Sequence, residues 1–231
     1  ASAVIALIGK WRDEHAVTVP LTQEASQAQS STGGGSQAAG SHGGSPAGSA
    51  GGAAMVMPAG TYQPKARWAL ANPPAGKKPP NWEASWKRFG GGESLEKIAL
   101  TQENGKPIQP STVLNHLMSA LLQGRPMELQ RLAQQAAAAQ CSPPSQEEWD
   151  MLTSAEAAAA VDVVKVEKVA QTDLLKAFLP EAEKPYAERT EAEKEKLAAW
   201  YPKCTWFMAM RRVGLTPSFE QGGAAKKARI E

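Results

Sequence analysis

A long run without charge limits how much of this chain can fold. The 231-residue sequence contains no Asp, Glu, Lys or Arg between Ala25 and Pro64, and most of that run is Gly, Ser and Ala. Such a segment has too little apolar surface to offset the conformational entropy that ordering would cost. We therefore expect a disordered linker over residues 25–80, which ends in the proline-rich stretch ANPPAGKKPP.

The remaining chain divides around this linker. Residues 1–24 form a short N-terminal segment, residues 81–216 should form a helical domain, and residues 217–231 a basic flexible tail. The chain starts at Ala1 rather than Met, which suggests a processed product or a fragment of a larger protein.

Composition excludes several classes of protein. The apolar stretch from Ala3 to Ile8 is too short for a signal peptide or a membrane span, so we expect a nuclear or cytoplasmic protein without a membrane partner. Cys141 and Cys204 lie far apart and there are only three histidines, which supports neither a disulfide framework nor a zinc site. We expect no metal and no other cofactor.

Helix signals dominate the chain beyond Asn81. SQEE (residues 145–148) and TEAE (residues 190–193) are capping boxes, which predict helices over about 146–160 and 191–200, the second ending before Pro202. TDLLKAFLP should form a short helix stopped by Pro180, and KCTWFMAMRRVG a further helix closed by Gly214. Residues 161–169 fit a strand or a helix extension equally. The expected fold is mainly α.

Residues 93–124 have the outline of a helix-turn-helix. A helix over 93–102 is broken by Asn104 and Gly105, and a second helix can begin at Pro110 and end at Gly124. The spacing of apolar residues in the second helix predicts a buried stripe formed by Leu114, Leu117, Met118 and Leu121. Polar residues share the opposite face, where they could contact phosphates or base edges: Thr112, Asn115, His116, Ser119 and Gln123.

The segments ESLEKIA, IQPSTVLNHLMSALLQGRPMELQRLA and WFMAMRRVG resemble the helix-turn-helix domain near the C-terminus of RecQ-type and Werner-type helicases. The likeness is specific over residues 94–132 and looser over 145–215. It implies a DNA-binding fold, with Ser111, Thr112, Asn115 and His116 at the start of the recognition helix. The short STVLNHL motif also resembles LuxR-type transcription regulators.

The residues expected to contact nucleic acid come from this second helix and from nearby cations. Residues 110–123 contain no Lys or Arg, so this helix alone should bind DNA weakly. The basic tail, with Lys226 and Lys227, could supplement it. The tryptophans are better explained by core packing than by base stacking. The predicted set is Lys106, Ser111, Thr112, Asn115, His116, Ser119, Arg125, Arg211 and Arg212.

Motifs for catalysis are missing from the sequence. It contains no GxxxxGK[ST], HExxH or GxSxG pattern, and His116 has no acidic or thiol partner placed by spacing, so we assign no catalytic residue. The leading hypothesis is a non-catalytic accessory module that binds nucleic acid, DNA foremost, beside a helicase or nuclease in the same complex or parent chain. The alternatives are a protein-interaction domain that uses the uncharged second helix, and a transcription regulator.

Overall fold

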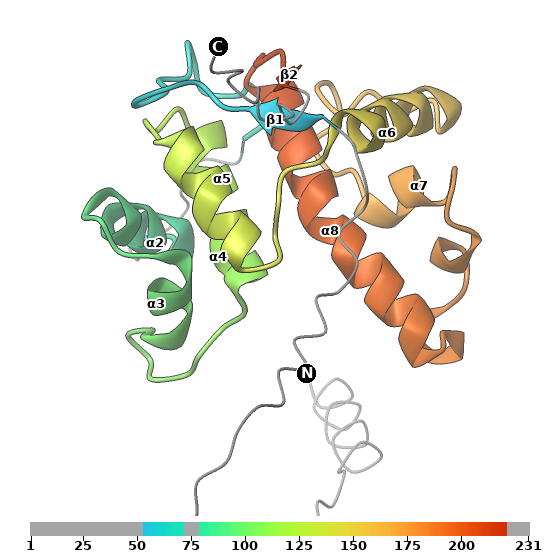
Figure 1. The fold of residues 1–231 in the computed structure, drawn as a ribbon, viewed down its shortest axis with the longest axis horizontal. Helices are drawn as coiled ribbons and strands as arrows, with labels where there is room; N and C mark the ends of the chain where they lie inside the picture. The colour runs from blue at the N-terminus through green and yellow to red at the C-terminus, as the bar shows by residue number, and fades with distance from the viewer. Residues whose placement is uncertain (1–52, 72–78, 221–231) are drawn as a thin grey trace, which may run out of the picture. The chain divides into compact units, whose positions relative to one another are not determined.

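A computed structural model describes residues 53–71 and 79–220 as a mainly helical unit, which confirms the expected fold class (Figure 1). The predicted segment 1–24, residues 25–52 and 72–78 of the predicted linker, and residues 221–231 of the predicted tail lie outside this description. The elements in chain order are β1 (Ala54–Val56), α2 (Asn81–Gly90), α3 (Leu95–Leu100), α4 (Pro110–Leu122), α5 (Leu129–Ala138), α6 (Gln146–Ala158), α7 (Gln171–Leu175), η1 (Pro180–Ala182), η2 (Tyr186–Glu188), α8 (Glu191–Arg212) and β2 (Ser218–Glu220).

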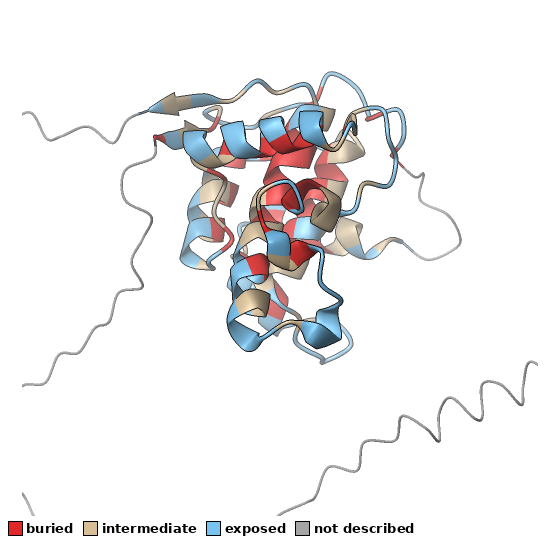
Figure 2. Ribbon diagram, turned by 90° about the vertical axis from the view of Figure 1, so that its right-hand side faces the viewer, coloured by how far each residue is buried: buried red, intermediate tan, exposed pale blue. Residues whose placement is uncertain are grey.

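Helix α4 is the centre of the unit, and α2, α3 and α8 pack against it. Its predicted ends are confirmed, because Pro110 occupies the first helical position and Gly124 beyond the last turn has a φ of 81°. The predicted apolar stripe is buried, and Figure 2 shows that the buried residues lie where the helices face one another. Among the thirteen residues of α4, Asn115 is the one with an exposed side chain. The helix is therefore mostly interior.

Both capping boxes are present, but the helix that starts after Thr190 does not end before Pro202. It continues through Pro202 to Arg212, so two predicted helices are one helix, α8. An internal proline removes a helical hydrogen bond and costs about 3 kcal/mol. Burial of the residues that follow, including Trp206 and Phe207 with no exposed surface, is worth about 1.5–3 kcal/mol for each large side chain and offsets that cost.

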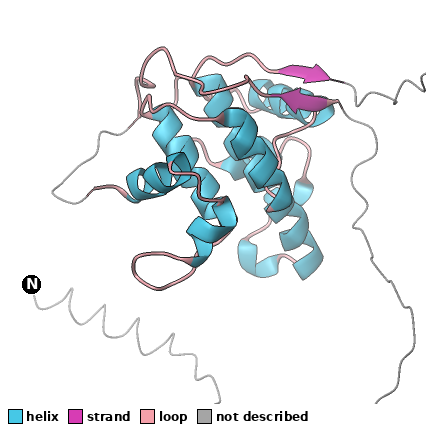
Figure 3. Ribbon diagram, turned by 60° about the vertical axis from the view of Figure 1, so that its left-hand side comes forward, coloured by secondary structure: helices cyan, strands magenta, loops and turns pink. Residues whose placement is uncertain are grey.

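Residues 53–71 fold against the helices, so the domain boundary predicted near Pro80 is wrong for this segment. Strand β1 pairs with β2, as Figure 3 shows. The pairing is antiparallel, and Met55 lies opposite Phe219. Tyr62 forms a second antiparallel bridge with Met127. The indole N–H of Trp68 donates to the carbonyl of Val164 at 2.9 Å. Buried apolar side chains of this segment, among them Met57 and Trp68, add to the core.

The predicted flexible tail is likewise wrong for residues 217–220, since residues 218–220 form β2 and the ring of Phe219 lies 6.4 Å from that of Trp149. Residues 161–169 form neither the strand nor the helix extension considered above. They form turns held by side chains. Glu156 accepts the N–H of Val163 at 3.0 Å and Asp162 accepts the N–H of Val164 at 3.0 Å.

Candidate nucleic-acid interface

Polar residues predicted to share one face of α4 form hydrogen bonds with different neighbouring helices. The ring Nδ1 of His116 lies 2.9 Å from the hydroxyl of Ser85 on α2, and desolvation by burial lowers the pKa of this histidine. On another side, the hydroxyl of Thr205 on α8 donates to Asn115 Oδ1 at 2.9 Å. Ser119 donates to the backbone carbonyl of Asn115 at 2.8 Å. His116 and Asn115 thus link α4 to α2 and to α8, while Ser119 bonds within α4, and these side chains do not form one open surface for base contacts.

Ser85 and His116 form a close polar pair between two helices. The Ser85 side chain is largely buried, with a relative exposure of 3 %, and Ser85 is also among the residues that line the cavity at the start of α4. The contact joins α2 to α4 through a satisfied hydrogen bond, as buried polar groups require.

The start of α4 lies beside a small polar pocket. Thr112 and His116 line this cavity of about 290 Å³ together with Gln102 and Asn104 from the preceding connection. Lys106 is exposed in that connection, where its backbone N–H donates to Asn104 Oδ1 at 3.0 Å. Ser111 is half-buried in the first turn of α4. Thr112 and His116 are thus the members of the predicted set that share one cavity.

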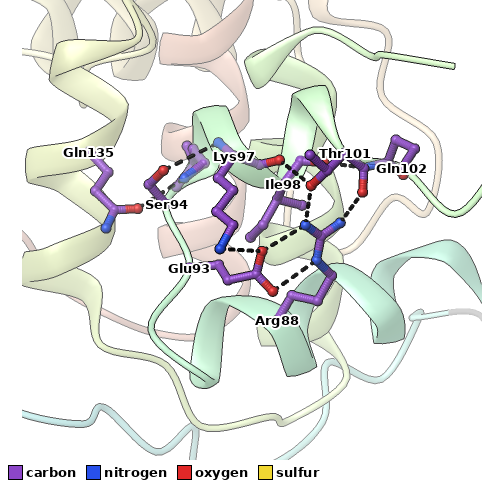
Figure 4. Close-up of polar contacts among 9 residues, drawn as sticks. Arg88, Glu93, Ser94, Lys97, Ile98, Thr101, Gln102 and Gln135 are labelled. Atoms are coloured by element: carbon purple, nitrogen blue, oxygen red, sulfur yellow. Dashed lines mark hydrogen bonds and ion pairs between the residues drawn. The ribbon is translucent and has the colours of Figure 1, made fainter. Parts of the chain in front are cut away.

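The connection from α3 to α4 is longer than a helix-turn-helix turn. It spans residues 101–109, whereas the motif usually has about three or four residues there. Arg88 of α2 secures its beginning by donating to both carboxylate oxygens of Glu93, at 3.1 and 2.7 Å, and to the carbonyl of Thr101 at 2.7 Å (Figure 4). Because its hydrogen bonds are made internally, Arg88 is not a free cation for a phosphate.

Arg211 and Arg212, both predicted to contact nucleic acid, are engaged by the protein itself. Arg211 forms an ion pair with the buried Glu156 at 3.3 Å. Arg212 lies over the ring of Trp68 at 4.2 Å and donates to the carbonyl of Val163 at 2.9 Å, and burial lowers its pKa. Arg211 therefore connects the end of α8 to α6, and Arg212 attaches the turns of residues 161–169 to the same end of α8.

Arg125 has a different environment. It follows the C-terminal end of α4 and is exposed, and its guanidinium carbon lies 5.3 Å from the ring centroid of Trp86 and 6.0 Å from that of Trp82. Both tryptophans are half-buried and lie one helical turn apart on α2, and the indole N–H of Trp86 donates to the carbonyl of Pro126 at 2.9 Å. We call Trp82, Trp86 and Arg125 the tryptophan–arginine cluster.

A second arginine, Arg67, lies near this cluster, and Lys65 precedes it by two positions in the sequence. The backbone of Arg67 packs against Gly124, where an added Cβ would meet its nitrogen at 3.4 Å, so Arg67 is a close neighbour of Arg125. Lys65, Arg67 and Arg125 take part in none of the ion pairs identified within residues 53–71 and 79–220. Glu83, the acidic residue nearest along α2, is paired with Lys87 at 2.8 Å.

Charge is distributed unevenly along the described chain. Residues 53–71 and 79–142 carry eight Lys and Arg against five Asp and Glu, whereas residues 143–220 carry ten against fourteen. The cluster thus belongs to the positive half of the described sequence. An electrostatic attraction for a polyanion is expected on this half and not on the other.

The expectation that the tryptophans pack in the core holds for Trp82 and Trp86, which pack against the buried residues and remain half-exposed, but their position beside Arg125 was not predicted. The signal that could have linked them is their i, i+4 spacing, which places both indoles on one side of α2. The alternative of a protein interface on α4 has less open surface than expected, because α2, α3 and α8 pack against that helix.

Comparison of the chain with models of protein families, with curated proteins and with solved structures found no match. The resemblance to helicase-associated domains therefore stays a prediction. Within the two described ranges, no helix is long and apolar enough to cross a membrane, and no three His, Cys, Asp or Glu side chains are grouped so as to hold a metal ion.

Proposed function

We propose that this chain is a non-catalytic accessory module that binds single-stranded nucleic acid, DNA foremost, through Trp82, Trp86 and Arg125. The observation that carries the proposal is an exposed arginine over two half-buried indoles, with the backbone of Arg67 packed against the preceding residue, Gly124. Proteins that bind single strands without sequence preference combine such cations with aromatic rings on which bases stack. A single strand is favoured over a duplex because only unpaired bases can reach an indole face.

The proposal moves the contact surface away from the polar residues of α4. Asn115 and His116 have protein partners, and losing them should affect folding before it affects binding. Lys106 stays available as a phosphate contact because its side chain is exposed. A role beside a helicase or nuclease, as the family resemblance implies, remains compatible with a module that concentrates a partner on DNA.

Fluorescence anisotropy with a labelled thymidine strand of about twelve nucleotides, a length within the usual site sizes, tests the proposal. Trp82→Ala should lower affinity about tenfold or more, since loss of one stacked base costs about 1–3 kcal/mol. Arg125→Gln should lower the slope of log affinity against log salt by about 0.7, the contribution of one phosphate on a single strand. Equal-length RNA and duplex DNA show which nucleic acid is preferred.

Trp200→Ala is the matched control for this experiment. Trp200 also carries a cation over its ring, Lys203 at 5.0 Å, but that lysine is paired with Glu148, and both residues lie in the negative half of the sequence. Its loss should leave binding unchanged. Equal loss of affinity in the Trp82 and Trp200 variants would refute the assignment, as would an affinity that does not respond to salt.

A further inference from the structure

A cavity adjoins the tryptophan–arginine cluster through a shared residue. It has a volume of about 380 Å³ and lies between α2 and the start of α5, where Trp86, Gly90, Thr61, Met127 and Arg131 are among its lining residues. Small-molecule sites in proteins commonly have volumes of about 300–1,000 Å³. Because Trp86 belongs both to the cavity and to the cluster, the two are contiguous at this residue.

The walls of the cavity include a fixed arginine. The guanidinium carbon of Arg131 lies 4.1 Å from the ring centroid of Phe89, and this side chain donates to the carbonyl of Phe89. Its Nε is 3.1 Å from a carboxylate oxygen of Glu128 and is buried, yet it makes no aligned hydrogen bond. The side chain is therefore held in place by the protein before any ligand arrives, which lowers the entropy cost of binding.

We propose that this cavity receives one nucleobase of the strand bound at the cluster, an inference that rests on the proposed function. A base has two flat faces and a polar edge, and it stacks on indole rings and on guanidinium planes. Trp86 and Arg131 supply those surfaces, and Met127 adds apolar contact. Glu128 and Thr61 are also lining residues, and their side chains carry groups that can hydrogen-bond with the edge of the base.

Two substitutions add bulk to the lining of the cavity from different segments. Gly90 ends α2, and a Cβ added there meets no atom within 4 Å, so the first atom of the Gly90→Leu side chain has room. Thr61 is exposed on the segment after β1, and Thr61→Leu narrows the cavity from that side. Gly90→Ala is the control, because it changes the same backbone position while adding one methyl group. Circular dichroism checks that each variant keeps its helical content.

Binding is measured for each variant with a thymidine strand and with a strand of equal length that lacks bases. Both leucine variants should lower affinity for the thymidine strand about tenfold, the effect of losing one stacked base, without changing affinity for the abasic strand. Gly90→Ala should bind as the unmodified chain does. An equal loss with the abasic strand would mean that the substitutions obstruct the backbone path, and this would overturn the inference.

Failure of this inference and failure of the proposed function give different results. If the leucine variants bind the thymidine strand normally while Trp82→Ala loses affinity, the cavity holds no base and the cluster remains the binding surface. If the unmodified chain binds no strand at low salt, both proposals fail together.

Discussion

Replacing Arg212 with methionine should destabilise the fold by about 2–4 kcal/mol without affecting nucleic-acid binding. The side chain donates to the carbonyl of Val163 at 2.9 Å and lies 4.2 Å from the ring of Trp68. A hydrogen bond from a charged group contributes about 1.5–3 kcal/mol, and a cation over an aromatic ring about 0.5–1 kcal/mol at a partly exposed site. Methionine retains the apolar stem but neither interaction, so both are lost together.

Urea unfolding followed by circular dichroism measures this loss, provided that the slope against denaturant stays constant. Lys168→Met is the matched control, because Lys168 is exposed in the neighbouring loop and should change the free energy of unfolding by less than about 0.5 kcal/mol. The anisotropy assay is run on the same samples. An Arg212 variant of normal stability that binds a strand less tightly would refute this reasoning and return Arg212 to the interface.

Three further perturbations test the fold around the site. Burial lowers the pKa of His116 below its unfolded value of about 6.5. The contribution of the neutral histidine to stability is therefore complete above that pH and falls as the pH drops toward the folded-state pKa. His116→Gln should remove this part of the decline in the free energy of unfolding, which urea unfolding measures between about pH 7 and 5. Gly124→Ala should lower the free energy of unfolding by about 1–3 kcal/mol, because φ at this residue is 81°. Gly90 has neither a positive φ nor atoms near an added Cβ, so Gly90→Ala should be neutral or stabilising by up to about 1 kcal/mol. Equal effects of the two substitutions in urea or thermal unfolding would contradict the importance of the positive φ. Trp206→Phe should cost about 1–3 kcal/mol, because it leaves the buried carbonyl of Cys141 without the 3.0 Å indole hydrogen bond; an unchanged midpoint of unfolding would show that this carbonyl finds another partner.

Local sequence signals predicted the helix starts well. Ser145 and Thr190 both form capping boxes with the residue three positions later, and Pro110 begins α4, because these signals act through the first helical turn alone. Gly214 likewise ends the last helix with a φ of 70°. Such features depend on residues a few positions apart, which a sequence displays directly.

Long-range packing decided the parts that the sequence did not reveal. Pro202 reads locally as a helix end, yet the buried residues beyond it keep α8 continuous. The strand at residues 54–56 has its partner at residues 218–220, and three residues are too few to show an alternating pattern. No local pattern in the sequence indicates that α8 and α2 pack against α4. The polar residues of α4 were therefore predicted to form an open surface.

The candidate site also depends on long-range contacts that the sequence does not show. Arg211 and Arg212 are adjacent cations in the sequence, and only the fold places Glu156 and Trp68 beside them. Conversely, Arg125 is separated from Trp86 by about forty positions, although the two lie together in space. A charge count therefore overestimated the free cations near the end of α8 and missed the aromatic partners of Arg125.

The most direct test of the central claim is a titration of the chain with a thymidine strand, monitored through the nuclear magnetic resonance signals of the indole N–H groups. We expect the signals of Trp82 and Trp86 to shift with increasing strand and those of the buried Trp149 and Trp206 to stay in place. Assignment by single tryptophan substitutions identifies each signal. Binding that leaves Trp82 and Trp86 unshifted, while backbone signals of α4 move, would contradict the account and restore α4 as the contact surface.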